Sequence, residues 1–446
     1  MNDCIKQFFE KTKEIGKIEN HLYKEYSVKN GLRNEDGTGV LVGLTKISDV
    51  VGYCRECDTK VDMPGELYYR GIDVKDIIAN ASKRNADVFE EVCFLILFGY
   101  LPNVEEFEIF KNELHKKYAL PKGFLENKIL RSPTHNLMNK LQQDVLTLYA
   151  YDKTPDDVSV DHILDQGLHI VSKVPSLICY NYQSKIHYFD EQSMFIHHVD
   201  PSLSFAQNIL QMIRPDRKFT DIEAMVLDIA LVLHADHGGG NNSTFVNVVM
   251  SSSGTDIYSS FAGAIGSLKG PKHGGANLKV CGMMEQVIET IGYSEDEDEI
   301  RAIIKRLLNK DFYDQSGLVY GMGHAVYTIS DPRSEVLCDA AYKLAKEKQM
   351  LKEYKFYKRF EEVAKEVIYE HKGIRCSSNV DFYSGFVYEM LNIPKDMYTL
   401  LFVCARTIGW LAHNIESQLY SGKIVRPATK YVGELQEYVE LEKRGE

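Results

Sequence analysis

The chain has 446 residues, of which 44% are hydrophobic and 26% are charged, and its formal net charge is −12. These proportions are those of globular proteins, so they exclude a disordered or fibrous chain, and the length allows two or three lobes. The negative charge disfavours a nucleic-acid partner, because a phosphate backbone needs a basic surface. We therefore expect a folded protein that binds small molecules.

The N-terminal stretch reads MNDCIKQFFEKTKEIGKIEN and is charged throughout, and the nine cysteines follow no regular spacing. Both features favour a cytoplasmic location over secretion. Charges interrupt every apolar run within the about 20 residues that a membrane helix needs, so no membrane span is expected. Cys54 and Cys57 have the CxxC spacing of a zinc or redox motif, but no second pair follows to complete four ligands.

Short alternating patterns predict strands in GVLVGLTKI (39–47) and GELYYRGIDV (65–74). Elsewhere apolar residues recur at three- and four-residue steps, which predicts helices. The clearest patterns are VFEEVCFLILFGYLP, IEAMVLDIALVLHADH, LKVCGMMEQVIETIG and YTLLFVCARTIGWLAHNIESQL. The predicted fold class is all-α with minor β structure near the N-terminus. Glycine and proline cluster at 269–277 and 391–396, which bracket a segment of domain size.

The motif HADHGGGNNST follows a predicted helix that begins with a capping box of Thr220 and Glu223. If Gly238 adopts the left-handed C-cap, His234 and His237 lie in the last turn of that helix. A histidine there is favoured by the helix macrodipole without any further role. A metal pair is the alternative, but a third protein ligand and a helix-borne glutamate base are not evident.

The motif KGPKHGGAN holds His273 in a loop directly before a predicted helix. A histidine that faces the positive end of a helix is biased toward its neutral form, which can donate a hydrogen bond to a carbonyl and stabilise an enolate. A loop histidine without a task is the alternative.

The motif GMGHAVYTISDPR contains Gly321 and Gly323 but lacks the third glycine of the dinucleotide fingerprint. Its backbone amides can still bind a ligand. The spacing within the motif leaves His324 undecided between packing and chemistry.

Asp381 begins a further helical pattern, where an aspartate is either an N-cap or a general base. Arg406 lies in a helix that is apolar on almost every side. A buried guanidinium without a partner costs several kcal/mol, so we expect it to meet a carboxylate of a side chain or of a ligand. Arg333 and Arg426 are two further candidate carboxylate clamps, because their planar forks suit bidentate contact.

Taken in order, these motifs resemble the citrate synthase family, as do GELYYRGIDVKDI and FEEVCFLILFGYLP nearer the N-terminus. The resemblance covers nearly the whole chain. It implies a mostly helical homodimer in which each subunit has two domains. The large domain would be 1–278 plus 392–446, and the small, mobile, CoA-side domain would be 279–391.

The resemblance also implies an acyltransferase that condenses acetyl-CoA with oxaloacetate and hydrolyses citryl-CoA to citrate and CoA, at the start of the tricarboxylic acid cycle. Acetyl-CoA would be a co-substrate, with no permanently bound cofactor and no metal. The nearest alternative is 2-methylcitrate synthase, which acts on propionyl-CoA. A metal-dependent hydrolase built on HADH and a helical binding scaffold are more remote alternatives.

The resemblance assigns Asp381 as the base that takes a methyl proton from acetyl-CoA, His273 as the donor to the thioester oxygen, and His324 as the donor to the ketone of oxaloacetate. Further residues would bind the dicarboxylate: His237, Arg333, Arg406 and, from the partner subunit, Arg426. The adenine of CoA would meet the backbone at Val319, Gly321 and Gly323.

Two positions depart from the family. Ala325 and Thr328 stand where family members often carry a basic residue that meets the CoA phosphates. This contact is therefore unassigned, with Lys372 and Arg375 as candidate substitutes.

Overall fold

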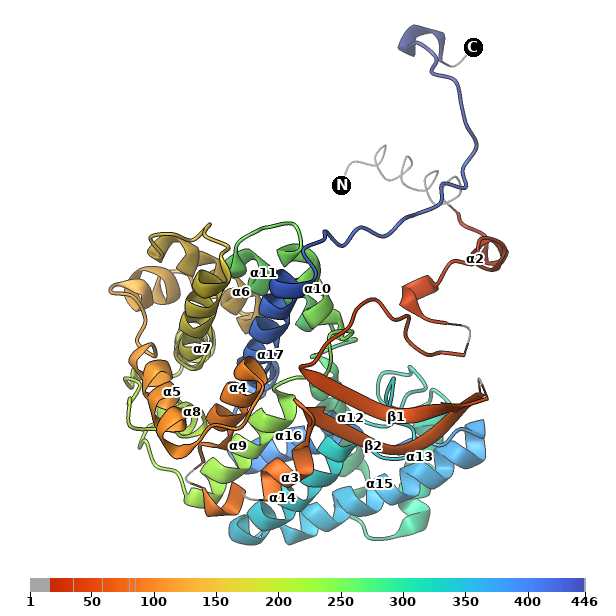
Figure 1. Ribbon diagram of the computed structural model, residues 1–446. Helices are drawn as coiled ribbons and strands as arrows, with labels where there is room; N and C mark the ends of the chain where they lie inside the picture. Colours follow the sequence, from red (N-terminus) through yellow and green to blue (C-terminus); the bar gives the residue numbers. More distant parts are fainter. Residues whose placement is uncertain (1–16, 35, 58, 80, 85, 445–446) are drawn as a thin grey trace. The chain divides into compact units, whose positions relative to one another are not determined.

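The computed structural model describes residues 17–34, 36–57, 59–79, 81–84 and 86–444. The contacts divide the chain into a body, residues 43–424, and a terminal unit formed by the described parts of 1–42 and 425–446 (Figure 1). Both predicted domain boundaries, near 278 and near 391, fall inside the body. The division into a large and a small domain stays a prediction.

The described chain is mainly helical, with one three-stranded antiparallel sheet in the order β1-β2-β3. The strands are β1 (Ser48–Glu56), β2 (Thr59–Tyr69) and β3 (Ile72–Asp73). The helices up to α9 are α2 (Asn20–Glu25), α3 (Val74–Ala79), α4 (Val88–Phe98), α5 (Val104–Lys116), α6 (Leu137–Leu148), α7 (Val160–Phe189), α8 (Phe205–Ile213) and α9 (Asp221–His234). The later helices are α10 (Asn242–Ser251), α11 (Ile257–Leu268), α12 (Ala276–Ile291), α13 (Glu297–Leu308), α14 (Pro332–Lys348), α15 (Leu351–Lys372), α16 (Val380–Met390) and α17 (Tyr398–Tyr420). Short turns are η1 (Asn30–Leu32), η2 (Ala81–Lys83), η3 (Leu125–Leu130), η4 (Tyr149–Tyr151), η5 (Lys395–Met397) and η6 (Leu441–Lys443).

The all-α fold class and the four strongest helical patterns are confirmed as α4, α9, α12 and α17. The strand predicted at 39–47 is wrong, because β1 begins only at Ser48. Leu41 is 93% exposed and Leu44 is 100% exposed, so the alternation there has no apolar face to bury. The prediction at 65–74 is confirmed in part: β2 ends at Tyr69, β3 follows, and α3 starts at Val74.

The β1–β2 hairpin covers the loop that contains His324. Adjacent to it, Gly52 and Gly65 leave no room for a side chain, since a Cβ on either would collide with the backbone oxygen of Val326 or Ser330 respectively. The Gly65 amide also donates to the Ser330 hydroxyl at 3.2 Å. Small residues at these two points therefore let the sheet and the loop approach closely.

Helix α17 is the central element of the body and contacts α4, α7, α9 and α10 (Figure 1). Its side chains from Tyr398 to Leu401 and from Val403 to Asn414 are buried. Trp410 and Arg406 are among the largest fully buried side chains. The Arg406 guanidinium is thus a cation in the middle of the hydrophobic core, where charged side chains are rare unless they have a partner.

In the described part of the chain, no helix combines the length and the apolar character needed to cross a membrane.

Candidate active site

The first site segment begins where α9 ends. The capping box of Thr220 and Glu223 is confirmed, and the helix stops at His234. His237 therefore lies beyond the last turn, which corrects the prediction that both histidines lie in it. The reason is local: the C-cap falls at Ala235, and the left-handed residue, Gly238 with φ 79°, comes only after His237.

Asp236 fixes the turn after α9. Its carboxylate accepts from the Gly238 amide at 3.1 Å and from the Ser48 hydroxyl, and it lies 3.1 Å from Nε2 of His413 on α17. These partners outweigh burial and hold the pKa of Asp236 below its usual value. The turn that presents His237 is thus tied to both β1 and α17.

His237 is neutral at physiological pH. Burial, followed by the positive charge of Arg333, lowers the pKa of His237 well below its ordinary value. Its Nε2 is buried and has no hydrogen-bond partner among the described residues. The ring packs edge-on against His324 with centroids 5.2 Å apart. An unpartnered buried nitrogen of this kind is costly unless a ligand meets it.

Arg406 is 1% exposed, as its sequence context predicts. Its Nε donates to the His234 carbonyl at 2.8 Å, and its guanidinium lies 4.8 Å from the centroid of the Phe402 ring. Its Nη2 has no partner, and within the described chain no carboxylate lies within ion-pair distance. Burial lowers the pKa of Arg406 to about 10, so it still carries its charge at neutral pH.

Arg333 is 4% exposed and forms a two-point contact with Asp331, with Nε–Oδ1 at 3.0 Å and Nη2–Oδ2 at 2.7 Å. Burial alone would lower its pKa, but the Asp331 carboxylate raises the pKa of Arg333 above its ordinary value. Asp331 is the N-cap of α14, and Pro332 follows at the first helical position. The start of the helix therefore orients the guanidinium.

The tautomer of His324 follows from its backbone contacts. Its Nδ1 accepts from the amides of Val326 and Tyr327 at 3.1 and 3.2 Å, so the neutral ring carries its proton on Nε2. Nη2 of Arg333 lies 3.4 Å from that Nε2. A carbonyl or carboxylate oxygen of a ligand placed beside these two groups would accept a hydrogen bond from both.

His273 lies in the turn before α12, which starts at Ala276 as predicted. Burial, followed by the charge of Arg406, lowers the pKa of His273 to about 4, so its imidazole is neutral at pH 7. Its Nε2 lies 3.1 Å from the Ser243 hydroxyl oxygen, and that oxygen accepts from Nε1 of Trp410 at 3.3 Å. The ring is held on one side and can serve a ligand on the other.

Asp381 is not the N-cap of its helix. Asn379 caps α16, and its side chain accepts from the Asp381 amide at 3.1 Å. The described residues offer no hydrogen-bond donor to the Asp381 carboxylate. Burial raises the pKa of Asp381 to about 6, although nearby Arg333 opposes the shift. A carboxylate without partners, with a raised pKa, has the properties of a general base.

The loop at 319–323 is bound to the start of α16. The Gly323 amide donates to the Ser377 carbonyl at 2.7 Å, and the Asn379 amide donates to the Gly321 carbonyl at 2.9 Å. Gly321 has φ 83° and Gly323 has φ 94°. The segment that carries His324 and the segment that carries Asp381 are therefore one hydrogen-bonded unit.

Most of the predicted residues come together. Arg333 is within electrostatic reach of His237, Asp381 and Arg406, and Arg406 is within reach of His273. Arg426 belongs to the terminal unit, so its predicted role is untested. Lys372 and Arg375 are exposed, as are Cys54 and Cys57. In the described chain, no group of three or more His, Cys, Asp or Glu side chains is placed to hold a metal ion.

Three residues that matter here were missed by the sequence reasoning: Asp331, Ser243 and Asp236. The first had a readable signal, because an aspartate directly before a proline is a typical helix start. Ser243 and Asp236 lie within the HADHGGGNNST motif, but nothing in their spacing identifies the side chains that they orient.

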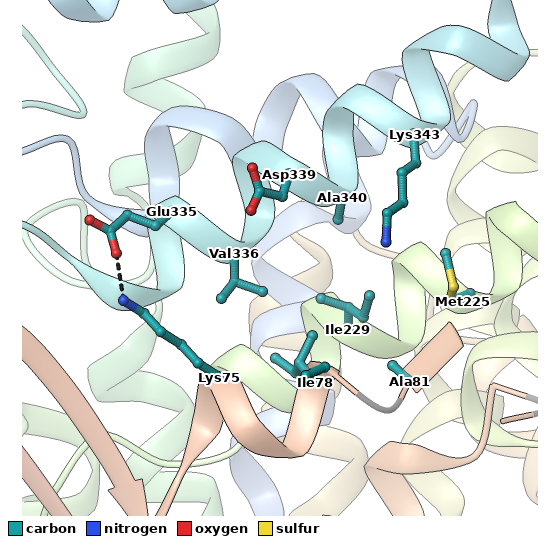
Figure 2. Close-up of a pocket in the computed structure, with 11 residues that line it drawn as sticks. Lys75, Ile78, Ala81, Met225, Ile229, Glu335, Val336, Asp339, Ala340 and Lys343 are labelled. Atoms are coloured by element: carbon teal, nitrogen blue, oxygen red, sulfur yellow. Dashed lines mark hydrogen bonds and ion pairs between the residues drawn. The ribbon is translucent and has the colours of Figure 1, made fainter. Parts of the chain in front are cut away.

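A hollow in the surface of the body lies away from these residues, between α3, α9 and α14 (Figure 2). Its volume is about 340 Å³, its base is apolar, and the ion pair of Lys75 and Glu335 spans one side at 2.7 Å. It contains none of the predicted site residues. The chemistry therefore belongs to the histidine, arginine and aspartate cluster.

Comparison with known proteins gives the same picture. The sequence model described as "Citrate synthase, C-terminal domain" matches residues 34–428. A citrate synthase of Haloferax volcanii is 34% identical over 89% of this chain and 94% of its own length. A 2-methylcitrate synthase of Shewanella oneidensis is 31% identical over 82% of this chain and 88% of its own length.

Among solved structures, the chain is similar to citrate synthase from Thermoplasma acidophilum in a ternary complex with carboxymethyl coenzyme A and oxaloacetate. The TM-score is 0.75 and the identity 26%, over 94% of this chain and 99% of that one. The citrate synthase of Thermotoga maritima gives a TM-score of 0.71 at 27% identity, over 94% of this chain and 100% of its own.

Proposed function

This chain belongs to the citrate synthase family, and from that premise we propose that it condenses acetyl-CoA with oxaloacetate and hydrolyses citryl-CoA to citrate and CoA. The observation that carries the proposal is a pair of buried nitrogen atoms without partners. Arg406 Nη2 and His237 Nε2 are both buried without partners among the described residues. Burying such polar atoms is costly unless a ligand meets them, and a dicarboxylate accepts from the Arg406 guanidinium and from a protonated ring nitrogen.

Oxaloacetate binds first in this proposal. Arg406 meets one carboxylate, and Arg333, already oriented by Asp331, contributes to the other. His324 donates from Nε2 to the ketone oxygen, because its Nδ1 is occupied by two backbone amides. The ketone carbon becomes more electrophilic through that hydrogen bond.

Proton removal from the acetyl methyl group is assigned to Asp381. A thioester methyl is a weak acid, so the developing oxyanion must be stabilised in the same step by a fixed donor. His273 provides it as a neutral imidazole with a pKa near 4. The carboxylate of Asp381, with a pKa of about 6, is ionised at pH 7 and is a stronger base than an ordinary aspartate.

The enolate then attacks the polarised ketone, and His324 supplies the proton to the new alkoxide. Water finally cleaves the thioester of citryl-CoA. The loop at Val319, Gly321 and Gly323 is proposed to meet the CoA adenine, which is supported by its hydrogen bonds to the Asp381 segment. The reaction needs a site without bulk water, so closure of a small domain (279–391) onto a large one is part of the proposal.

The proposal extends to a homodimer in which Arg426 reaches the site of the partner subunit, and to action in the cytoplasm at the first step of the tricarboxylic acid cycle. The CoA phosphates have no assigned partner at Ala325 or Thr328. Lys372 and Arg375, which are exposed near the start of the Asp381 segment, are proposed to meet them.

The test is release of free CoA thiol by the purified protein. We expect release from acetyl-CoA only when oxaloacetate is present, with no added metal. A colorimetric assay for free thiol, run with acetyl-CoA alone, with oxaloacetate alone and with both together, measures this release. Absence of release in the presence of both, from acetyl-CoA and from propionyl-CoA alike, would overturn the assignment.

A second candidate is 2-methylcitrate synthase, favoured by the relative of that name at 31% identity. One methylene changes discrimination by only about 1–3 kcal/mol, so the two activities can overlap. The same assay with propionyl-CoA separates them. A kcat/KM for propionyl-CoA well above that for acetyl-CoA would move the assignment to 2-methylcitrate synthase.

A further inference from the structure

A second, smaller hollow is lined by residues of α12, α15, α16 and the start of α17, and no step of the proposed reaction uses it. Its volume is about 180 Å³. Sites for drug-sized molecules measure about 300–1,000 Å³, so this one suits a smaller ligand. It is lined by Cys281, Glu285, Ile288, Glu289, Tyr293, Tyr357, Gly385, Glu389, Lys395 and Tyr398.

Two of the lining tyrosines are almost fully buried but lack partners. Tyr357 is 5% exposed and Tyr398 is 3% exposed. No hydrogen bond joins either hydroxyl to any described residue, although both side chains line the hollow. The Tyr357 ring stacks on Phe386 with centroids 4.5 Å apart, and the Tyr398 ring packs against Tyr388 at 5.1 Å. The buried unpartnered atoms of the described chain do not include these two hydroxyls, so both are accessible from the hollow, where a ligand can form hydrogen bonds with them.

The charge of the hollow is negative. Glu285, Glu289 and Glu389 line it, and Lys395, paired with Glu285, is the one basic residue among the lining residues. The formal charge of these four groups is −2 at neutral pH. Burial and the nearby charge of Glu285 raise the pKa of Glu389, as expected where carboxylates repel one another. An anionic ligand is therefore excluded, and a cation would relieve the repulsion.

Within the described chain, no cluster here has three metal-ligating side chains in place. Tyrosine rings and hydroxyls beside carboxylates instead match the chemistry of protonated amines, which combine cation–π contact with charge-assisted hydrogen bonds. We propose that this hollow, the α12–α17 pocket, binds a small organic cation with one or two protonated amino or guanidino groups. Its ammonium groups meet Glu389 and Glu289, and its methylene chain lies against Ile288 and the tyrosine rings.

The position of the pocket means that a bound ligand would affect the arrangement of the two predicted domains. Lys395 and Tyr398 lie on one side of the predicted domain boundary near 391, and the other lining residues lie on the opposite side. A ligand that contacts both sides stabilises one arrangement of the two domains over others. This consequence, a changed KM for acetyl-CoA, rests on the proposed function; the binding itself does not.

Titration calorimetry on the full-length protein, without substrates, tests the binding. The probes are 1,4-diaminobutane and agmatine at constant ionic strength. We expect saturable binding of at least one probe, with affinity about tenfold lower in Glu389→Gln, a change of about 1.4 kcal/mol. Tyr398→Phe, which removes only a hydroxyl, is expected to weaken binding about threefold.

Glu105→Gln is the matched control, because Glu105 is an exposed carboxylate on α5 outside the pocket and the substitution changes net charge equally. Affinity for the probes should be unchanged in it. No saturable binding of either probe, or equal weakening in Glu105→Gln and Glu389→Gln, would overturn the proposal. Because the assay contains no substrate, failure of the thiol assay leaves this outcome unaffected, and loss of binding leaves the proposed reaction unaffected.

Discussion

Arg406 shows how one residue can carry a functional argument. It is buried in α17, it donates to the His234 carbonyl, and its Nη2 has no described partner. A protein that needed only stability would place an apolar side chain there, because a buried unpaired charge is costly. The cost is understandable if the position serves a ligand carboxylate.

We therefore expect Arg406→Gln to fold at least as stably as the wild type while losing affinity for oxaloacetate. The loss of a buried charge-assisted contact predicts a KM for oxaloacetate raised about 100-fold. Thermal melts with and without oxaloacetate check this: the wild type should gain stability from the ligand and the variant should not. Arg131→Gln, at an exposed position with no proposed contact to either substrate, is the control. Unchanged stabilisation in Arg406→Gln would remove Arg406 from the oxaloacetate site.

Asp381 gives a prediction about pH. Burial raises its pKa to about 6, so the basic form is lost as the pH falls through 6. The kcat/KM for acetyl-CoA should decline below that pH. Asp381→Asn should lower kcat by about 10²- to 10⁴-fold, the range of general base catalysis, with oxaloacetate binding retained. A kcat equal to that of the wild type would exclude Asp381 as the base.

The same group links pH to stability. The pKa of Asp381 is higher in the folded chain than its ordinary value of 3.8, so ionisation costs folding energy above pH 6 and costs nothing below pH 4. We expect Asp381→Asn to be more stable than the wild type at pH 7.5, by about 3 kcal/mol, and nearly equally stable at pH 4. Denaturant unfolding at both pH values measures the difference. Greater stability of the variant at pH 4 alone would contradict the direction of the pKa shift.

At the scale of elements, the site depends on loops locked to helix starts. Asn379 caps α16 and also holds the loop before His324. Its backbone amide donates to the Gly321 carbonyl, and its side-chain amide donates to the Gly323 carbonyl at 2.9 Å. Ser243 near the start of α10 and Asp331 at the start of α14 orient His273 and Arg333 in the same way. Helix starts are suited to this because their amides and caps are fixed by the helix itself.

Alanine substitutions at Gly321 and Gly323 allow the cost of backbone strain to be distinguished from the cost of a steric clash. Both have φ near 90°, but a Cβ at Gly321 would meet Phe382 of α16 at 2.9 Å, whereas a Cβ at Gly323 would have open space. Gly321→Ala should cost more stability than Gly323→Ala, which carries only the strain of about 1 kcal/mol. Gly321→Ala should also raise the KM for acetyl-CoA, because the clash displaces the loop from α16. Equal effects of the two substitutions on stability would show that the loop does not pack as described.

At the scale of the whole molecule, the proposed exchange of Arg426 between subunits gives a prediction about mixed dimers. The body contains Arg406, whereas Arg426 belongs to the terminal unit. If Arg426 serves the partner subunit, a dimer made of one Arg406→Gln chain and one Arg426→Gln chain has one site with neither change. Such a mixed dimer should have about half the wild-type activity, although each homodimer is impaired.

Two different affinity tags isolate the mixed dimer after co-expression, and the thiol assay measures its activity. If Arg426 instead served its own subunit, both sites of the mixed dimer would carry one change, and no activity would be regained. That result would contradict the proposed exchange between subunits.

The sequence by itself determined the helical fold class and the helices α4, α9, α12 and α17, and it proposed the site residues as a set. Strong 3.6-residue periodicity predicts helices such as α12 and α17 because one apolar face has to be buried whatever the partner is. The ordered motifs gave the family. The same local reasoning wrongly predicted a strand at 39–47, where the alternating apolar residues have no surface to pack on. It also wrongly placed His237 in the last turn of α9, because the turn fixed by Asp236 ends the helix earlier.

Only the tertiary structure decided which side chains face one another and in what protonation state. Asp381 could have been an N-cap until Asn379 was seen to occupy that place. His324 could have been packing until its Nδ1 was seen to accept two amides, which leaves its proton on Nε2 beside Arg333. Burial and through-space charge set these properties, and both depend on residues far apart in the chain, which periodicity and spacing do not encode.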